Sequence, residues 1–162
     1  MQVERQAKEG LEGSEAPGLF VSQFTHSLDP KKRLIIPAIW RQNVGYPKQL
    51  FVLRGVNQKC LYVFPSREIH KRLEAIQTRS IADEKATQFM RILASSADLV
   101  TWDGQGRIRI KDELLSYAEL TDQVLMASNF RGFELWNPLR WASVDQASAA
   151  EGFVEAAKYV GF

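Results

Sequence analysis

Ser27-Leu-Asp-Pro-Lys-Lys-Arg-Leu-Ile-Ile36 returns 74 residues further along the chain as Thr101-Trp-Asp-Gly-Gln-Gly-Arg-Ile-Arg-Ile110. In each stretch an aspartate precedes an arginine by four positions, so that Asp29 aligns with Asp103 and Arg33 with Arg107. Turn-forming and polar residues lie between the two charges, and an apolar run follows them. The pattern predicts a tight turn leading into a β-strand, twice in one chain.

The repetition extends beyond these two stretches. At the same offset the run 49–53 aligns with 123–127, and after a gap of one residue the run 60–65 aligns with 133–138, including the proline that ends each. Matched apolar runs, turns and prolines in one order indicate an internal duplication of a small β-rich unit. A unit of about 50 residues is marginal alone, which favours two interlocked cores or packing on another subunit.

Each copy is expected to contain the same series of elements. The two strands around the aspartate–arginine turn are predicted to form a β-hairpin, followed by a short helix, two more strands and a helix after the shared proline. After the first turn the predicted ranges are 33–36, 38–44, 49–54 and 60–64 in the first copy, and 107–110, 112–118, 123–127 and 133–136 in the second. The fold class predicted from the residues is mainly β with helices, α+β.

Helices are also expected outside this shared series. In the helix after Pro65, the apolar residues Ile69, Leu73 and Ile76 recur at helical spacing, and Ser66 is its predicted cap. A connecting helix is predicted within 80–95, with Ser80 and Asp83 as candidate caps, and a terminal amphipathic helix within 147–160. The terminal helix can cover its own core or pack on another subunit; the pattern does not decide between the two, but the marginal size of each unit favours the second.

Charge is distributed unevenly along the chain. The net charge is +2 overall, but 29–79 holds eleven Lys or Arg against three acidic residues, whereas 80–162 holds eight against twelve. A basic half is suited to a polyanion such as nucleic acid, although basic surfaces are often only solvated. Five aromatic residues are expected in the core, Trp102, Trp136, Trp141, Tyr62 and Phe64, with Trp40 as a candidate subunit contact.

Several functional classes find no support in the residues. Cys60 is the single cysteine and lies in an apolar run, so we expect a buried thiol rather than a nucleophile. His26 and His70 are the only histidines and lie far apart in the sequence, so we expect no metal site. We find no phosphate-binding glycine loop and no nucleophile with a nearby base, and therefore expect no cofactor and no enzyme. Neither a signal peptide nor a membrane span is evident, which predicts a cytoplasmic protein.

The combination Ser-Leu-Asp-x-x-x-Arg-Leu-x-Ile-Pro over 27–37, then Ala-x-aromatic-Arg over 38–41, resembles the first half of an MraZ protein. The second combination, Asp-Gly-Gln-Gly-Arg-Ile-Arg-Ile over 103–110, then Gly-Phe-Glu-Leu-Trp over 132–136, resembles the second half. The likeness covers about 19–141, with a C-terminal helix after it. One Asp-x-x-x-Arg is a weak signal, whereas two in matched context within a repeat are specific.

This resemblance implies a tandem, pseudo-symmetric swapped-hairpin β-barrel of the AbrB and SpoVT type with flanking helices. It implies a nucleoid-associated transcriptional regulator, usually a repressor, that assembles as a ring-like homo-oligomer and binds direct repeats in double-stranded DNA upstream of division and cell-wall genes. The expected boundaries are a flexible tail over 1–18, a first repeat over 19–79, a connecting helix over 80–97, a second repeat over 98–145 and a C-terminal helix over 146–162.

The family's DNA-contacting loops correspond here to Asp29 with Arg33 and Asp103 with Arg107. An arginine offers a planar fork of donors suited to phosphate or to a guanine edge, and an aspartate across the turn can aim it. We assign Arg33 and Arg107 to base or groove readout, and Lys31, Lys32, Arg41 and Arg109 to phosphate contacts that position the protein. The alternative is that each aspartate and arginine form only a structural ion pair.

The chain departs from the family pattern in several places. Pro30, Lys31 and Lys32 stand where a glycine commonly precedes the arginine, so we expect a different turn geometry in the first loop. Lys111 replaces a proline, Val21-Ser22 follows Phe20 in place of a basic residue, and an acidic extension precedes it. A competing hypothesis keeps the same oligomeric fold but gives the loops to a protein partner or an antitoxin-like role.

Overall fold

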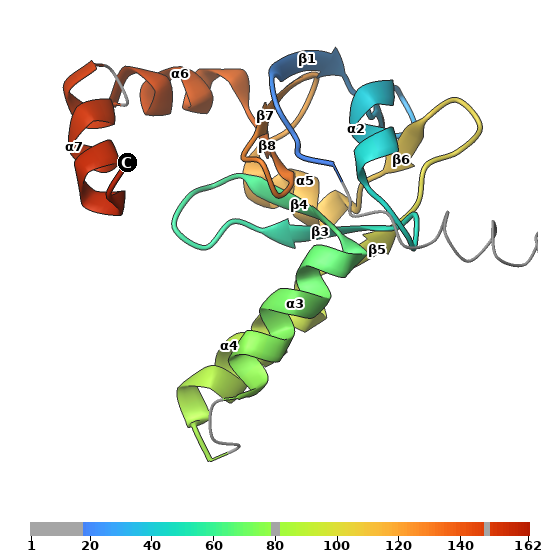
Figure 1. Ribbon diagram of the computed structural model, residues 1–162. Helices are drawn as coiled ribbons and strands as arrows, with labels where there is room; N and C mark the ends of the chain where they lie inside the picture. The colour runs from blue at the N-terminus through green and yellow to red at the C-terminus, as the bar shows by residue number, and fades with distance from the viewer. Residues whose placement is uncertain (1–17, 79–81, 148–149) are drawn as a thin grey trace, which may run out of the picture.

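The strands that follow each turn lie close to the ranges that the repeat predicts, and the longest of them are apolar runs such as Leu50–Arg54 and Leu61–Pro65. The computed structural model describes residues 18–78, 82–147 and 150–162 as an α+β structure (Figure 1), which confirms the predicted fold class. The strands are β1 Gln23–Ser27, β2 Arg33–Ile35, β3 Leu50–Arg54, β4 Leu61–Pro65, β5 Asp98–Val100, β6 Arg107–Arg109, β7 Gln123–Ser128 and β8 Phe133–Trp136. The helices are α2 Ala38–Asn43, α3 Ser66–Gln77, α4 Glu84–Ser96, α5 Asp112–Ala118, α6 Pro138–Ala147 and α7 Ala150–Val160.

The strands pair across the two repeats. Six of them form a sheet in the order β1-β7-β8-β4-β3-β5, and β2 pairs with β6 as a separate two-stranded ribbon. All of these pairs are antiparallel. The prediction of a local β-hairpin around each turn is therefore wrong, because the two strands that flank a turn pair with strands of the other repeat and diverge beyond the turn.

This exchange is the swapped arrangement that the family resemblance implies. β1 of the first repeat pairs with β7 of the second, and β5 of the second pairs with β3 of the first. The ribbon takes one strand from each repeat. Neither repeat can complete its sheet without the other, which is the physical reason that two marginal units form one stable structure.

The core lies between the sheet and the ribbon. Leu34 and Ile108 of the ribbon are fully buried in the same cluster as Val63 and Met126 of the sheet. Trp40 of α2 is also fully buried there, stacked on Phe133 with ring centroids 4.6 Å apart. The prediction that Trp40 is a subunit contact is therefore wrong, because this indole is enclosed by its own chain and its Nε1 donates to the Val21 carbonyl at 2.9 Å.

Other aromatic and sulfur-containing residues lie where the sequence places them. Trp136 and Phe64 are buried, and Trp102, Tyr62 and Trp141 are partly buried against the hydrophobic clusters. Cys60 is fully buried, as predicted. Burial raises the pKa of its thiol to about 12, with the Glu134 carboxylate adding to the shift, so the unreactive reading of Cys60 is supported.

Helices α3 and α4 form a hairpin that projects away from the sheet (Figure 1). Asp83 caps α4 by accepting a hydrogen bond from the Ala86 amide at 3.1 Å, as predicted. Ser66 is not the cap of α3, because Pro65 occupies that position and Ser66 is already helical and buried. The other candidate cap, Ser80, lies outside the described residues, as does the tail predicted over 1–18 apart from its last residue, Gly18.

Candidate nucleic-acid interface

The first loop, 29–33, is closed by its aspartate. The Asp29 carboxylate accepts hydrogen bonds from the amides of Lys31 and Arg33, both at 2.9 Å, and from Arg33 Nε at 2.7 Å. The Lys32 amide donates to the Asp29 carbonyl at 2.9 Å, and the Asp29 amide donates to the Arg33 carbonyl at 3.0 Å. One carboxylate therefore holds the turn and aims the guanidinium, as the sequence argument predicts.

The second loop, 103–107, repeats this network bond for bond. Asp103 accepts from the amides of Gln105 and Arg107 at 2.9 and 3.0 Å and from Arg107 Nε at 2.9 Å. The Gly106 amide donates to the Asp103 carbonyl at 2.9 Å. The duplication has therefore preserved the whole loop structure. It includes the ion pair between aspartate and arginine on which the alternative, purely structural interpretation is based.

The expectation that the first loop has a different turn geometry is wrong. Lys32 has a φ of 62° and Gly106, its counterpart, a φ of 79°. Both residues lie in the left-handed region that glycine enters without strain, so Lys32 adopts a glycine conformation despite its side chain. The first loop thereby keeps the same turn while presenting the exposed side chains of Lys31 and Lys32.

The hydrogen bonds affect the acidity of both aspartates. Partial desolvation raises the pKa of Asp29. The hydrogen bonds from the Arg33 amide and guanidinium, together with the positive charge of Arg33, lower it by more, so the pKa of Asp29 lies below its ordinary value. The pKa of Asp103 is also lowered, chiefly by the hydrogen bond from the Arg107 amide. Both carboxylates stay ionised at neutral pH and keep their arginines in place.

The two loops lie at opposite ends of the ribbon, whose outward face is basic. The register places Arg33 opposite Arg109 and Ile35 opposite Arg107. Because the residues between them, Leu34 and Ile108, are fully buried, these four side chains share the outer face. Three of the four outward positions are arginines.

The arginines of the loops remain accessible from outside. The side chains of Arg33 and Arg107 are 28% and 23% exposed, and each uses Nε for its aspartate. Within the described residues, no hydrogen bond engages the terminal nitrogens of either guanidinium. Arg109 differs, because it bonds to the Ile110 carbonyl and pairs with Asp112 at 3.0 Å.

Arg41 belongs to the second loop rather than to the first. Its Nε donates to the Ile36 carbonyl at 3.0 Å, and a Cβ built on Gly106 would lie only 2.6 Å from its Cζ. The guanidinium thus covers the glycine of the second loop. Beside it lie Lys48 and Trp102, which the sequence analysis did not assign to the site. The repeat gives no signal for either, because it aligns Lys48 with Asp122 and Trp102 with Leu28.

The described residues contain no group of three or more His, Cys, Asp or Glu arranged to hold a metal ion. Across the same part of the chain, none of the helices combines the length and hydrophobicity that crossing a membrane requires.

Comparison with known proteins gives one consistent family. A family model described as "MraZ protein, putative antitoxin-like" matches residues 19–92 and again 93–159. A protein of Roseiflexus sp. (strain RS-1) named "Transcriptional regulator MraZ" is 36% identical over 140 residues, covering 86% of this chain and 96% of the relative. Proteins of the same name from Thermomicrobium roseum and Halothermothrix orenii are each 34% identical, covering 83% and 86% of this chain and 92% and 94% of the relatives.

Proposed function

Because this chain belongs to the MraZ family, we propose that it is a sequence-specific transcriptional regulator that binds double-stranded DNA through its two loops and the ribbon between them. It binds direct repeats as a ring-like homo-oligomer, represses division and cell-wall genes, and acts in the cytoplasm at the nucleoid. The relatives named as transcriptional regulators support the general role. The family resemblance supports the direct repeats, the ring and the repressed genes, and the geometry of the ribbon supports the DNA-binding face.

The observation that carries the proposal is the outward face of the ribbon. A two-stranded antiparallel ribbon is narrow enough to enter the major groove of B-DNA. Here that face presents Arg33, Arg107 and Arg109, and the first two are held by carboxylates that leave their terminal nitrogens for a ligand. Such nitrogens match the O6 and N7 acceptors of guanine or a pair of phosphate oxygens.

The roles of the basic residues follow from their positions. Arg33 and Arg107 read base edges, because they are aimed and lie on the ribbon. Lys31 and Lys32 are exposed at the tip of the first loop, where ammonium groups reach phosphates and add affinity with little sequence information. Arg109 and Arg41 position the ribbon and the second loop.

The test uses a duplex that the wild-type protein selects from a random pool, titrated by fluorescence anisotropy at several salt concentrations. Arg33→Ala should weaken binding by about 1–3 kcal/mol and relax the base preference at one position, whereas Lys32→Ala should mainly flatten the salt dependence. Arg91→Ala, on exposed α4, is the matched control and should bind as the wild type does. Failure to enrich any duplex, or full affinity in Arg33→Ala, would contradict the proposal.

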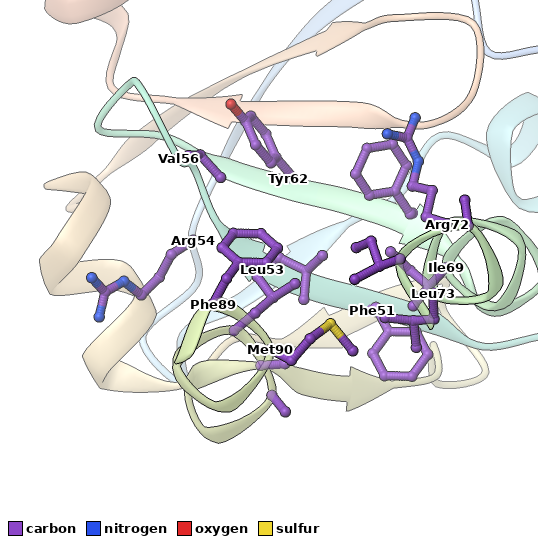
Figure 2. A pocket seen from close by; sticks show the side chains of 16 residues that line it. Phe51, Leu53, Arg54, Val56, Tyr62, Ile69, Arg72, Leu73, Phe89 and Met90 are labelled. Carbon is purple, nitrogen blue, oxygen red and sulfur yellow. The ribbon is translucent and has the colours of Figure 1, made fainter. Parts of the chain in front are cut away.

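An apolar surface supports the homo-oligomer. A groove of about 470 Å³ runs between α3, α4 and the sheet, lined by side chains such as Leu53, Leu73 and Phe89 (Figure 2). The same chain carries the opposite kind of surface on α7, where Phe153 is 70% exposed and Val160 73%. We assign the groove to α7 of another copy, with Arg54 at the rim facing the acidic Glu155.

A groove and a helix that differ from each other make a heterologous contact, with one surface of each kind on every subunit. Such head-to-tail contacts close into rings when the rotation between subunits allows it. A ring places several loop pairs side by side. Binding to neighbouring repeats then gains affinity through effective concentration, without any new contact.

The second candidate function is a protein-interaction or antitoxin-like module. The observation that favours it is that each aspartate and arginine already pair within their own loop. The family model's description also contains the word antitoxin. Retention of the wild type on heparin at moderate salt, lost in Arg33→Ala, would argue against this candidate.

A further inference from the structure

A hollow of about 680 Å³ lies beside the second loop, between α2 and the end of β5. The charged side chains that line it are both cations, Arg41 and Lys48. Tyr46 and Trp102 supply two aromatic walls. A concave surface with two cations and no lining carboxylate is suited to an anion.

The fold fixes the guanidinium of Arg41 and the backbone of Lys48 beside this hollow. Arg41 is fixed by its bond to the Ile36 carbonyl and by its contact with Gly106. Lys48 Nζ lies 5.3 Å from the centre of the Tyr46 ring, and the Lys48 carbonyl accepts a hydrogen bond from Thr101 Oγ1 at 3.1 Å. Thr101 is two residues before Asp103, so this bond ties the lysine to the base of the second loop.

Beside the first loop, a negative charge occupies the position that aligns with Lys48. The duplication aligns Lys48 with Asp122 and Arg41 with Leu115, which is buried. The Leu28 amide donates to the Asp122 carbonyl at 2.7 Å, which places this exposed aspartate at the base of the first loop. A carboxylate therefore stands beside one loop where an ammonium stands beside the other.

We propose that the hollow formed by Arg41, Lys48 and Trp102 receives a backbone phosphate of the bound DNA, and that the first loop has no equivalent site. Two cations attract a phosphodiester, and the guanidinium of Arg41 can present its terminal nitrogens to phosphate oxygens. At the first loop Asp122 repels a phosphate in that position. There the phosphate contacts come from the tip, through Lys31 and Lys32.

This inference rests on the proposed function and goes beyond it, because it gives each chain a direction on DNA. Two identical halves related by a two-fold axis prefer a palindromic site. Two halves with phosphate contacts at different places prefer one orientation. A series of chains in one orientation matches a site whose repeats all run the same way.

The experiment uses the full-length protein and the duplex selected by the wild type. Lys48→Gln should reduce the slope of log affinity against log salt by about one, and Asp122→Lys should increase it by about one. Lys85→Gln, on the exposed start of α4, is the control for loss of one positive charge and should keep the wild-type slope. Ethylation of the phosphate that meets the hollow should interfere at a position with no counterpart on the other flank of the repeat, where the contacts of Lys31 and Lys32 lie at the loop tip, and Lys48→Gln should weaken that one interference.

The outcomes separate this inference from the function on which it rests. If the wild type selects no duplex, the proposed function fails and this inference fails with it. If the wild type binds but Lys48→Gln keeps the full slope, or if ethylation interferes at the equivalent phosphate on both flanks, the directional phosphate site is wrong while DNA binding stands. In the double variant Lys48→Asp with Asp122→Lys, the interference at the hollow should weaken, because Arg41 alone remains there, and a new interference should appear at the equivalent phosphate on the other flank.

Discussion

Lys32 shows how far local chemistry can be inferred from single residues. Its position before the arginine suggests an altered turn, because a residue with a Cβ is strained at positive φ and glycine is not. The structure nevertheless gives it a φ of 62°, because five hydrogen bonds to and from the loop's first and last residues determine the backbone. The network outweighs a strain of about 1–2 kcal/mol.

At Lys32, stability and DNA binding are expected to oppose each other. Lys32→Gly should stabilise the folded protein by roughly 1 kcal/mol, because it removes the left-handed strain at some cost in chain entropy. The same change should weaken DNA binding and flatten its salt dependence, because one phosphate contact is lost. Urea unfolding and anisotropy measure the two effects, with Lys31→Gly as the matched variant without a strained φ; a destabilised Lys32→Gly protein would contradict the argument.

At the scale of elements, the sequence predicts what is local and fails on what is not. The ranges of the strands and of α5 follow from apolar runs and turn residues, and those signals lie within a few positions of each other. Which strands pair depends on contacts across about 100 residues, such as Ser27 with Gln123. The local hairpin was therefore the wrong pairing, and the correct exchange was implied only by family resemblance.

The loops are expected to be sensitive to acid in a defined direction. The folded pKa of Asp103 is lowered, so its stabilising contribution is fully present above the unfolded pKa of about 3.9 and is lost as the pH falls through the lower folded value. Asp103→Asn should therefore be less stable than the wild type at pH 7, and the difference should disappear in strong acid. Urea unfolding at both pH values measures this; an equal deficit at both would mean that the charge plays no part.

At the scale of the whole molecule, the candidate site is larger than the motif that identifies it. The aspartates and arginines were identifiable because they repeat in the sequence. Lys48 was not, because it joins the second loop only when β5 pairs with β3, and Trp102 was not, because the repeat aligns it with Leu28. The two halves of the repeat also differ in charge, because the aligned residues Lys48 and Asp122 carry opposite charges beside loops of the same shape.

Assembly should depend on the groove and on α7 together. Phe89→Glu and Phe153→Glu should each reduce the mass of the particle to that of one chain, because each places a charge in an apolar contact. Mass photometry, with circular dichroism to verify folding, measures the result. Ile39→Glu, at an exposed position on α2, should leave the mass unchanged. Oligomers of normal size in both groove and helix variants would place the subunit contact elsewhere.

The exchange of strands between repeats also governs how the protein emerges from the ribosome. When the first repeat has been synthesised, β1 and β2 still lack their partners β7 and β6, and β3 and β4, which pair with each other, each still lack one neighbour, β5 and β8. The backbone donors and acceptors on these edges stay open for as long as translation of the second repeat takes, which is several seconds at about 5–20 residues per second. During that interval the unpaired strand edges are exposed to other nascent chains on the same messenger RNA. A longer interval increases the need for a chaperone to protect these edges.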